Sequence, residues 1–119
     1  MLDADMVELT HLQHVWESGM RDAYTTYRVH ADRPVALAAA MVEAAAVLQG
    51  LGGAAANAVD LLLGDLCLAR ASRLVASTGN QRLQVDFARV VERTAAGAAG
   101  ASPTAPLREQ LVALLSGAT

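Results

Sequence analysis

The segment DLLLGDLCLARASRLV, residues 60–75, is the most apolar run of the chain, and Gly64 and Asp65 stand in its middle. Its length and composition predict a helix, with Asn57 placed to cap the first turn. A glycine inside a helix costs about 1 kcal/mol relative to alanine, and its usual benefit is the close approach of another backbone. A buried carboxylate must meet a cation, backbone donors or water. We therefore expect Asp65 to be buried, with its partner on another helix or another chain.

Apolar residues recur at helical spacing on both sides of this run, and no segment favours a strand. Gly19 is expected to weaken or bend the first helix, and Gly79 with Asn80 to form a turn. The sequence predicts five helices, which cover residues 3–29, about 34–49, about 58–78, about 81–96 and about 106–115.

The composition predicts one all-α domain that spans residues 1–119. Apolar residues make up 54% of the chain and aromatic residues 3%, so small alanines must fill much of the core. Residues 97–105, which are rich in Ala, Gly and Pro, are expected to be a flexible linker before the short last helix.

Charge and cysteine content exclude several classes of function. The net charge is −3 and all nine basic residues are arginines without a cluster, so the chain is not expected to bind nucleic acid. Cys67 is the single cysteine, which indicates a buried, reduced thiol and a cytoplasmic location. No signal peptide and no transmembrane segment is expected.

The second and third helices are apolar on nearly all sides, and a chain of this size has little interior in which to bury both. We therefore expect another protein chain to cover part of their surface. The candidate residues for this interface, or for the lining of an apolar tunnel, are Val47, Leu48, Leu62, Leu66 and Ala69.

Residues 37–97 resemble part of the trans-polyprenyl diphosphate synthases. Gly64 and Asp65 are followed by Ala69, Arg70 and Ala71, and Gly79 with Asn80 stands at the family's turn between two helices. Upstream, ALAAAMVEAAAVL resembles the Ala-rich helix that carries a glutamate, here Glu43, before the family's first aspartate-rich motif. The resemblance implies the amino-terminal half of the isoprenoid synthase fold, with structural roles for Glu43, Gly64, Asp65 and Arg70.

The sequence departs from the catalytic members of that family where the metal would bind. VLQGLGGAAAN, residues 47–57, contains no acid at the place of their first aspartate cluster. Ionisation of an allylic diphosphate requires metal ions held by carboxylates. We therefore expect no catalytic residues and no cofactor bound by this chain.

Because it is shorter than these synthases and poor in aspartate, the chain resembles the small subunit of two-component long-chain enzymes. Component I of heptaprenyl or hexaprenyl diphosphate synthase is such a subunit. The resemblance implies a hetero-oligomer with a catalytic large subunit. That subunit would hold Mg²⁺, and the small subunit would help to set product length.

Two alternatives stay open. The chain could be a self-associating helical interaction module unrelated to isoprenoids. It could also be a metal-binding bundle, because Glu8, His11, His14 and Glu17 are each three residues apart and Glu-x-x-His motifs hold metals in some bundles. Only one such motif occurs, so His11 and His14 are weak candidates.

Overall fold

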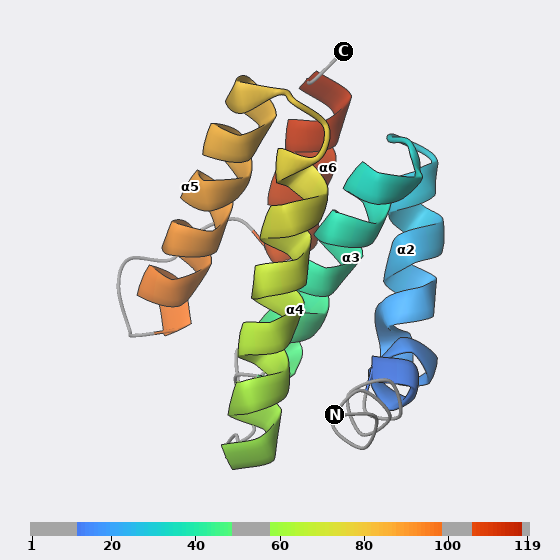
Figure 1. Cartoon of the computed structure of the whole chain (residues 1–119), viewed down its shortest axis with the longest axis vertical. Coiled ribbons are helices and arrows are strands. Elements are labelled where there is room, and N and C mark those ends of the chain that lie inside the picture. The colour runs from blue at the N-terminus through green and yellow to red at the C-terminus, as the bar shows by residue number, and fades with distance from the viewer. Residues whose placement is uncertain (1–11, 49–57, 99–105, 118–119) are drawn as a thin grey trace.

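The computed structural model describes residues 12–48, 58–98 and 106–117, and within these ranges the chain is helical with no strand. Residues 12–15 are helical and lead into the first numbered element. Neighbouring helices run in opposite directions from α2 to α6 (Figure 1). The elements are η1 (Trp16–Met20), α2 (Arg21–Arg28), α3 (Arg33–Leu48), α4 (Ala58–Ala76), α5 (Gln81–Ala98) and α6 (Leu107–Gly117).

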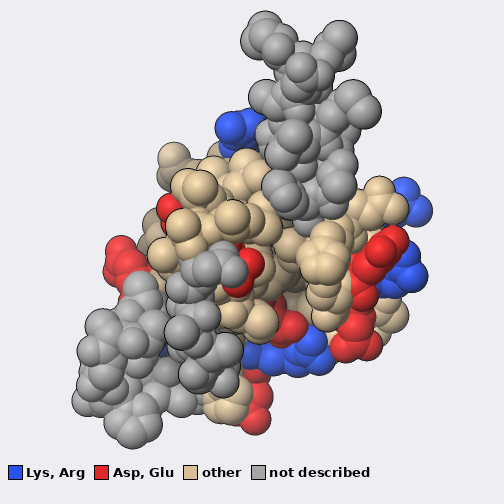
Figure 2. Space-filling model, turned by 90° about the horizontal axis from the view of Figure 1, so that it is seen from below, with Lys and Arg blue, Asp and Glu red and all other residues tan. Residues whose placement is uncertain are grey.

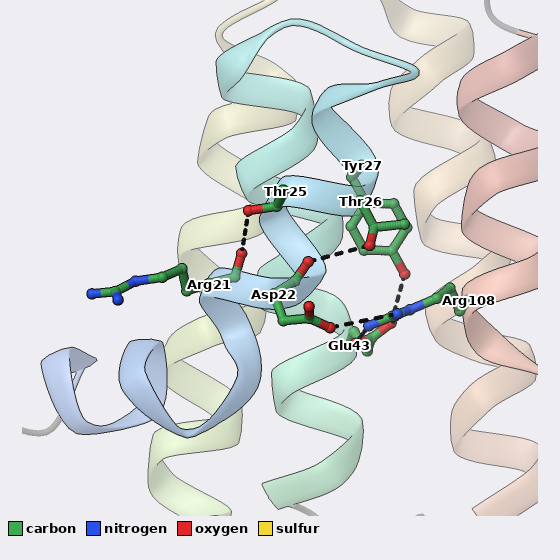
Figure 3. Close-up of polar contacts among 7 residues, drawn as sticks. All are labelled: Arg21, Asp22, Thr25, Thr26, Tyr27, Glu43 and Arg108. Carbon is green, nitrogen blue, oxygen red and sulfur yellow. Dashed lines mark hydrogen bonds and ion pairs between the residues drawn. The ribbon is translucent and has the colours of Figure 1, made fainter.

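The predicted all-α, five-helix bundle is confirmed, and the first helix has two arms, residues 12–18 and α2, which meet at a bend inside η1. The chain kinks at Gly19, which has φ 153° and ψ −19°. Residues with side chains rarely adopt this positive φ, so glycine is suited to the bend. The predicted bend at Gly19 is therefore confirmed, and the helical residues before Gly19 run in a different direction from α2 (Figure 3).

Helix α3 occupies the centre of the bundle and packs against η1, α2, α4 and α6. Half of its residues are buried, and most of these are alanines. Small side chains let helix axes approach to about 8 Å. Four neighbouring elements of the same chain therefore bury most of α3, and the exposed Val47 in its last turn is the part left for the expected partner chain.

The remaining core comes from larger residues on the surrounding helices. Tyr27 on α2, Cys67 on α4, and Leu111 and Leu115 on α6 are the largest fully buried side chains among the described residues. On α4, Gly64 is also buried, on the side that packs along α3. The position of Gly64 is thus compatible with its expected role, which is to let the backbone of another helix approach closely.

The turn predicted at residues 79–80 is confirmed. Gly79 has φ 72°, and the backbone N–H of Leu83 donates to Asn80 Oδ1 at 3.1 Å, which caps the start of α5. Helix α5 continues to Ala98, so the expected linker does not begin at residue 97; its remainder, 99–105, lies outside the described residues. No described helix has the length and hydropathy needed to cross a membrane.

Candidate functional site

Three elements meet at one polar cluster, formed by Tyr27 of α2, Glu43 of α3 and Arg108 of α6 (Figure 3). Arg108 donates from Nε to Glu43 Oε1 at 2.8 Å and from Nη2 to Oε2 at 2.6 Å. The Tyr27 hydroxyl donates to the same Oε1 at 2.8 Å. Glu43 therefore accepts three hydrogen bonds, and its two-pronged contact with Arg108 joins residues that are 65 positions apart.

The electrostatics of this cluster favour an ionised Glu43. Burial alone would raise the pKa of its carboxyl group, but the hydrogen bonds from Arg108 and Tyr27 outweigh burial and lower it. Burial and the nearby Glu43 carboxylate raise the pKa of Tyr27, and the hydrogen bonds to Glu43 raise that of Arg108. At neutral pH the cluster is thus a charged pair with a neutral phenol that donates to it.

Asp22 lies at the edge of this cluster and contributes little to it. Its Oδ2 is 3.9 Å from Arg108 Nη1, and its side chain is 82% exposed. At this distance the two groups form an ion pair without a hydrogen bond. Solvent screens such a pair strongly.

A pocket of about 330 Å³ opens beside the polar cluster and is bordered by the residues around the kink at Gly19. Its wall is mainly apolar, and charged groups from several elements border it. The described residues that line it are His14, Val15, Ser18, Gly19, Met20, Asp22, Glu43, Ala44, Val47, Leu48, Asp60, Leu63 and Arg108.

Large apolar side chains are exposed at the end of the bundle where α3 stops and α4 starts. Val47 is 67% and Leu62 is 69% exposed, and Val59 and Leu61 are also exposed. We call these four residues the apolar end. Seen from this side, uncharged side chains cover much of the described surface, and charged side chains lie among and around them (Figure 2).

The structure places the five predicted interface residues on two helices. Val47 and Leu62 belong to the apolar end, and Leu48 is half-buried in the wall of the pocket. On α4, Ala69 is exposed and Leu66 is half-buried. These positions do not form one continuous lining, because Val47 and Leu48 border the pocket whereas Leu66 and Ala69 do not.

The residues that matched the family pattern also have different surroundings. Glu43 is the centre of the polar cluster, Gly64 is buried and Arg70 is half-buried. The expectation that Asp65 is buried is wrong, because its side chain is exposed. The apolar run around it reflects helix α4 packing on α3 through its opposite side, and Asp65 lies on the side that faces solvent.

The weak metal-site candidates receive no support from neighbouring ligands. His14 is exposed at the pocket, and His11 lies outside the described residues. Among the residues that the structure describes, no group of three or more His, Cys, Asp or Glu side chains is arranged to hold a metal ion.

The sequence indicated Glu43 but not its two partners. Tyr27 is completely buried in the structure. Nothing in the sequence marked Arg108 as a partner of Glu43, because it is simply a charged residue next to the apolar stripe of the last helix. A burial argument could have found the pairing, because Glu43 is the only charge within residues 34–49 and needs a cation from elsewhere.

Comparison with known proteins gives no relative for this chain: no family model, no curated protein and no solved structure matches it.

Proposed function

We propose that this chain is a non-catalytic subunit that binds the catalytic large subunit of a long-chain prenyl diphosphate synthase and influences product length. The proposal starts from the resemblance of residues 37–97 to that family. The all-helical fold of the described residues is compatible with the resemblance. In the proposed complex, the large subunit holds Mg²⁺ and ionises the allylic diphosphate, and the complex is cytoplasmic.

The observation that carries the proposal is the apolar end. Val47, Val59, Leu61 and Leu62 all fall inside the segment that resembles the synthases, and they expose large apolar side chains together. Grouped exposed apolar residues are typical of surfaces that bind another protein. The non-catalytic part of the proposal is supported by the sequence of residues 47–57, which offers no carboxylate for a metal.

The test is co-expression of the chain with the aspartate-rich synthase chain of the same organism. Native mass spectrometry measures the complex, and elongation of an allylic diphosphate with isopentenyl diphosphate and Mg²⁺ measures its effect. We expect a hetero-oligomer, and we expect the synthase chain to gain activity or change product length only when this chain is present.

Surface variants locate the contact. Val59→Glu combined with Leu61→Glu places two charges in the apolar end outside Leu62, and we expect the affinity for the synthase chain to fall at least about tenfold. Val29→Glu is the matched control, because Val29 is 80% exposed directly after α2, at the end of the bundle opposite the apolar end (Figure 1). Absence of any complex, or a complex that leaves both activity and product length unchanged, would overturn the proposed function.

Self-association is a second candidate, and a separate surface of α4 favours it. That surface is lateral and carries both charges and small residues, whereas the apolar end caps the bundle. The two surfaces share only Leu62, so substitutions at their other residues test them independently.

A further inference from the structure

One side of α4 is exposed along most of the helix. Beyond its first residue, five exposed residues of α4 lie within an arc of about 80° when successive residues are placed 100° apart. We call them the α4 face: Leu62, Asp65, Ala69, Arg73 and Ala76. The buried residues Leu63, Cys67 and Ala71 lie on the other side of the helix. Because the buried side of α4 packs along α3, the α4 face points away from α3.

The charges on this face are placed symmetrically about its centre. Asp65 precedes Ala69 by four residues, and Arg73 follows it by four. We propose that two copies of this chain pair through the α4 face, with the two helices antiparallel and a twofold axis at Ala69. In this register Asp65 of each copy is level with Arg73 of the other, so two ion pairs form.

The small side chain at the centre makes this register sterically feasible. Alanine at the crossing point lets helix axes approach to about 8 Å, which brings an aspartate and an arginine at the same level within reach. Like charges stay apart, because eight residues separate Asp65 from Arg73 by about 12 Å along the axis. The side chain of Leu62, 69% exposed in the single chain, packs against Ala76 of the second copy.

Charge complementarity favours a second copy over an unrelated partner. A parallel pair in register would place each charge opposite its like, whereas the antiparallel pair places each opposite its complement. One pair of helices buries less than the roughly 1,200–2,000 Å² of a stable protein interface, so the dimer forms only at high concentration. This inference does not depend on the proposed function, and only Leu62 belongs to both surfaces.

Sedimentation velocity of the isolated chain over a range of concentrations tests the pairing. We expect a monomer–dimer equilibrium that weakens as salt is added, because the ion pairs are near solvent. Asp65→Arg alone and Arg73→Asp alone each replace two attractive pairs by repulsive ones, and we expect the dissociation constant to rise about tenfold. The double variant restores both pairs, so its dissociation constant should return to within about threefold of the original.

Arg33→Asp is the matched control, because it reverses an exposed charge on α3 outside the α4 face and should leave the equilibrium unchanged. Circular dichroism and urea unfolding show that each variant is folded. Three results would overturn the proposal: a monomer at every concentration, a dimer insensitive to both single reversals, or single reversals that the double variant fails to rescue. The last two would show that the copies pair through another face or in another register.

Discussion

Glu43 is the residue on which the packing of α2, α3 and α6 converges. Replacing it by glutamine keeps the size of the side chain but removes the charge that Arg108 and Tyr27 contact. Hydrogen bonds to a charged group contribute about 1.5–3 kcal/mol each. Because Arg108 is 42% exposed, we expect Glu43→Gln to lower the free energy of unfolding by only about 1–3 kcal/mol.

Urea unfolding measures this change, and Asp22→Asn is its control. Asp22 approaches the same guanidinium but is 82% exposed, so its loss should cost less than about 0.5 kcal/mol. Equal losses in the two variants would show that the hydrogen-bonded pair contributes no more than a surface contact.

The lowered pKa of Glu43 predicts how stability depends on pH. Its carboxyl group is more acidic in the folded chain than its ordinary value of 4.5, so the folded state favours the ionised form. This stabilisation is complete above the ordinary pKa and is lost as pH falls through the lowered folded-state pKa. Other carboxyl groups titrate in the same range, so the measurement is the difference in stability between the original chain and Glu43→Gln from pH 7 downward. A difference that does not shrink on acidification would contradict the prediction.

Leucines on α6 and α4 have opposite environments in spite of identical chemistry. Leu111 is fully buried and Leu62 is 69% exposed. We expect Leu111→Ala to lower the free energy of unfolding by about 2–5 kcal/mol, because the buried cavity collapses only partly. Leu62→Ala should change it by less than about 0.5 kcal/mol in the monomer. Similar values from urea unfolding of the two variants would mean that α6 does not dock as the structure shows.

The kink at Gly19, inside η1, can be tested by whether one substitution stabilises or destabilises the chain. If the helix were continuous through residue 19, Gly19→Ala would stabilise the chain by up to about 1 kcal/mol through helix propensity. At φ 153° a side chain is strained, although no atom lies within 4 Å of the added Cβ. We therefore expect Gly19→Ala to destabilise the chain by about 1–3 kcal/mol in urea unfolding. Stabilisation would show that the first helix runs straight.

At the level of whole elements, the sequence was sufficient to predict helix type and most boundaries. Turn residues such as Gly79 and Asn80 act locally, so their effect can be inferred without a fold. The position of each helix in the bundle could not be inferred in this way. The apolar pattern of α3 was compatible with an external partner, and only its place between four neighbouring elements explains why it is buried.

At the level of the whole molecule, the candidate site could be predicted only in part, because its contacts depend on where the helices lie in the bundle. Glu43 could be marked from sequence because it is an isolated charge among alanines. Its contact with Arg108 depends on how α6 returns to α3, and nothing local to residue 108 encodes that contact. Asp65 shows the reverse error, because an apolar neighbourhood in sequence does not determine which side of a helix faces solvent.

The burial of Cys67 allows the opening of the whole bundle to be measured. Its side chain is fully buried on α4, and burial raises the pKa of the thiol to about 11. Because the thiolate is the reactive form, a water-soluble thiol reagent should modify the native chain far more slowly than the urea-unfolded chain. Modification then requires opening of the core around α4, and its rate follows the equilibrium between closed and open states when reclosing is fast.

Core and polar-cluster variants should therefore raise the labelling rate according to their loss of stability, about tenfold for each 1.4 kcal/mol. Leu111→Ala should raise it more than Glu43→Gln, whereas Leu62→Ala and Asp22→Asn should leave it near the original value. This order follows because Cys67 belongs to the same buried cluster as Leu111 and Tyr27, so α2, α4 and α6 share one core. If Cys67 were labelled at one rate in all four variants, α4 would open independently of α6, and the described helices would not unfold as one cooperative unit.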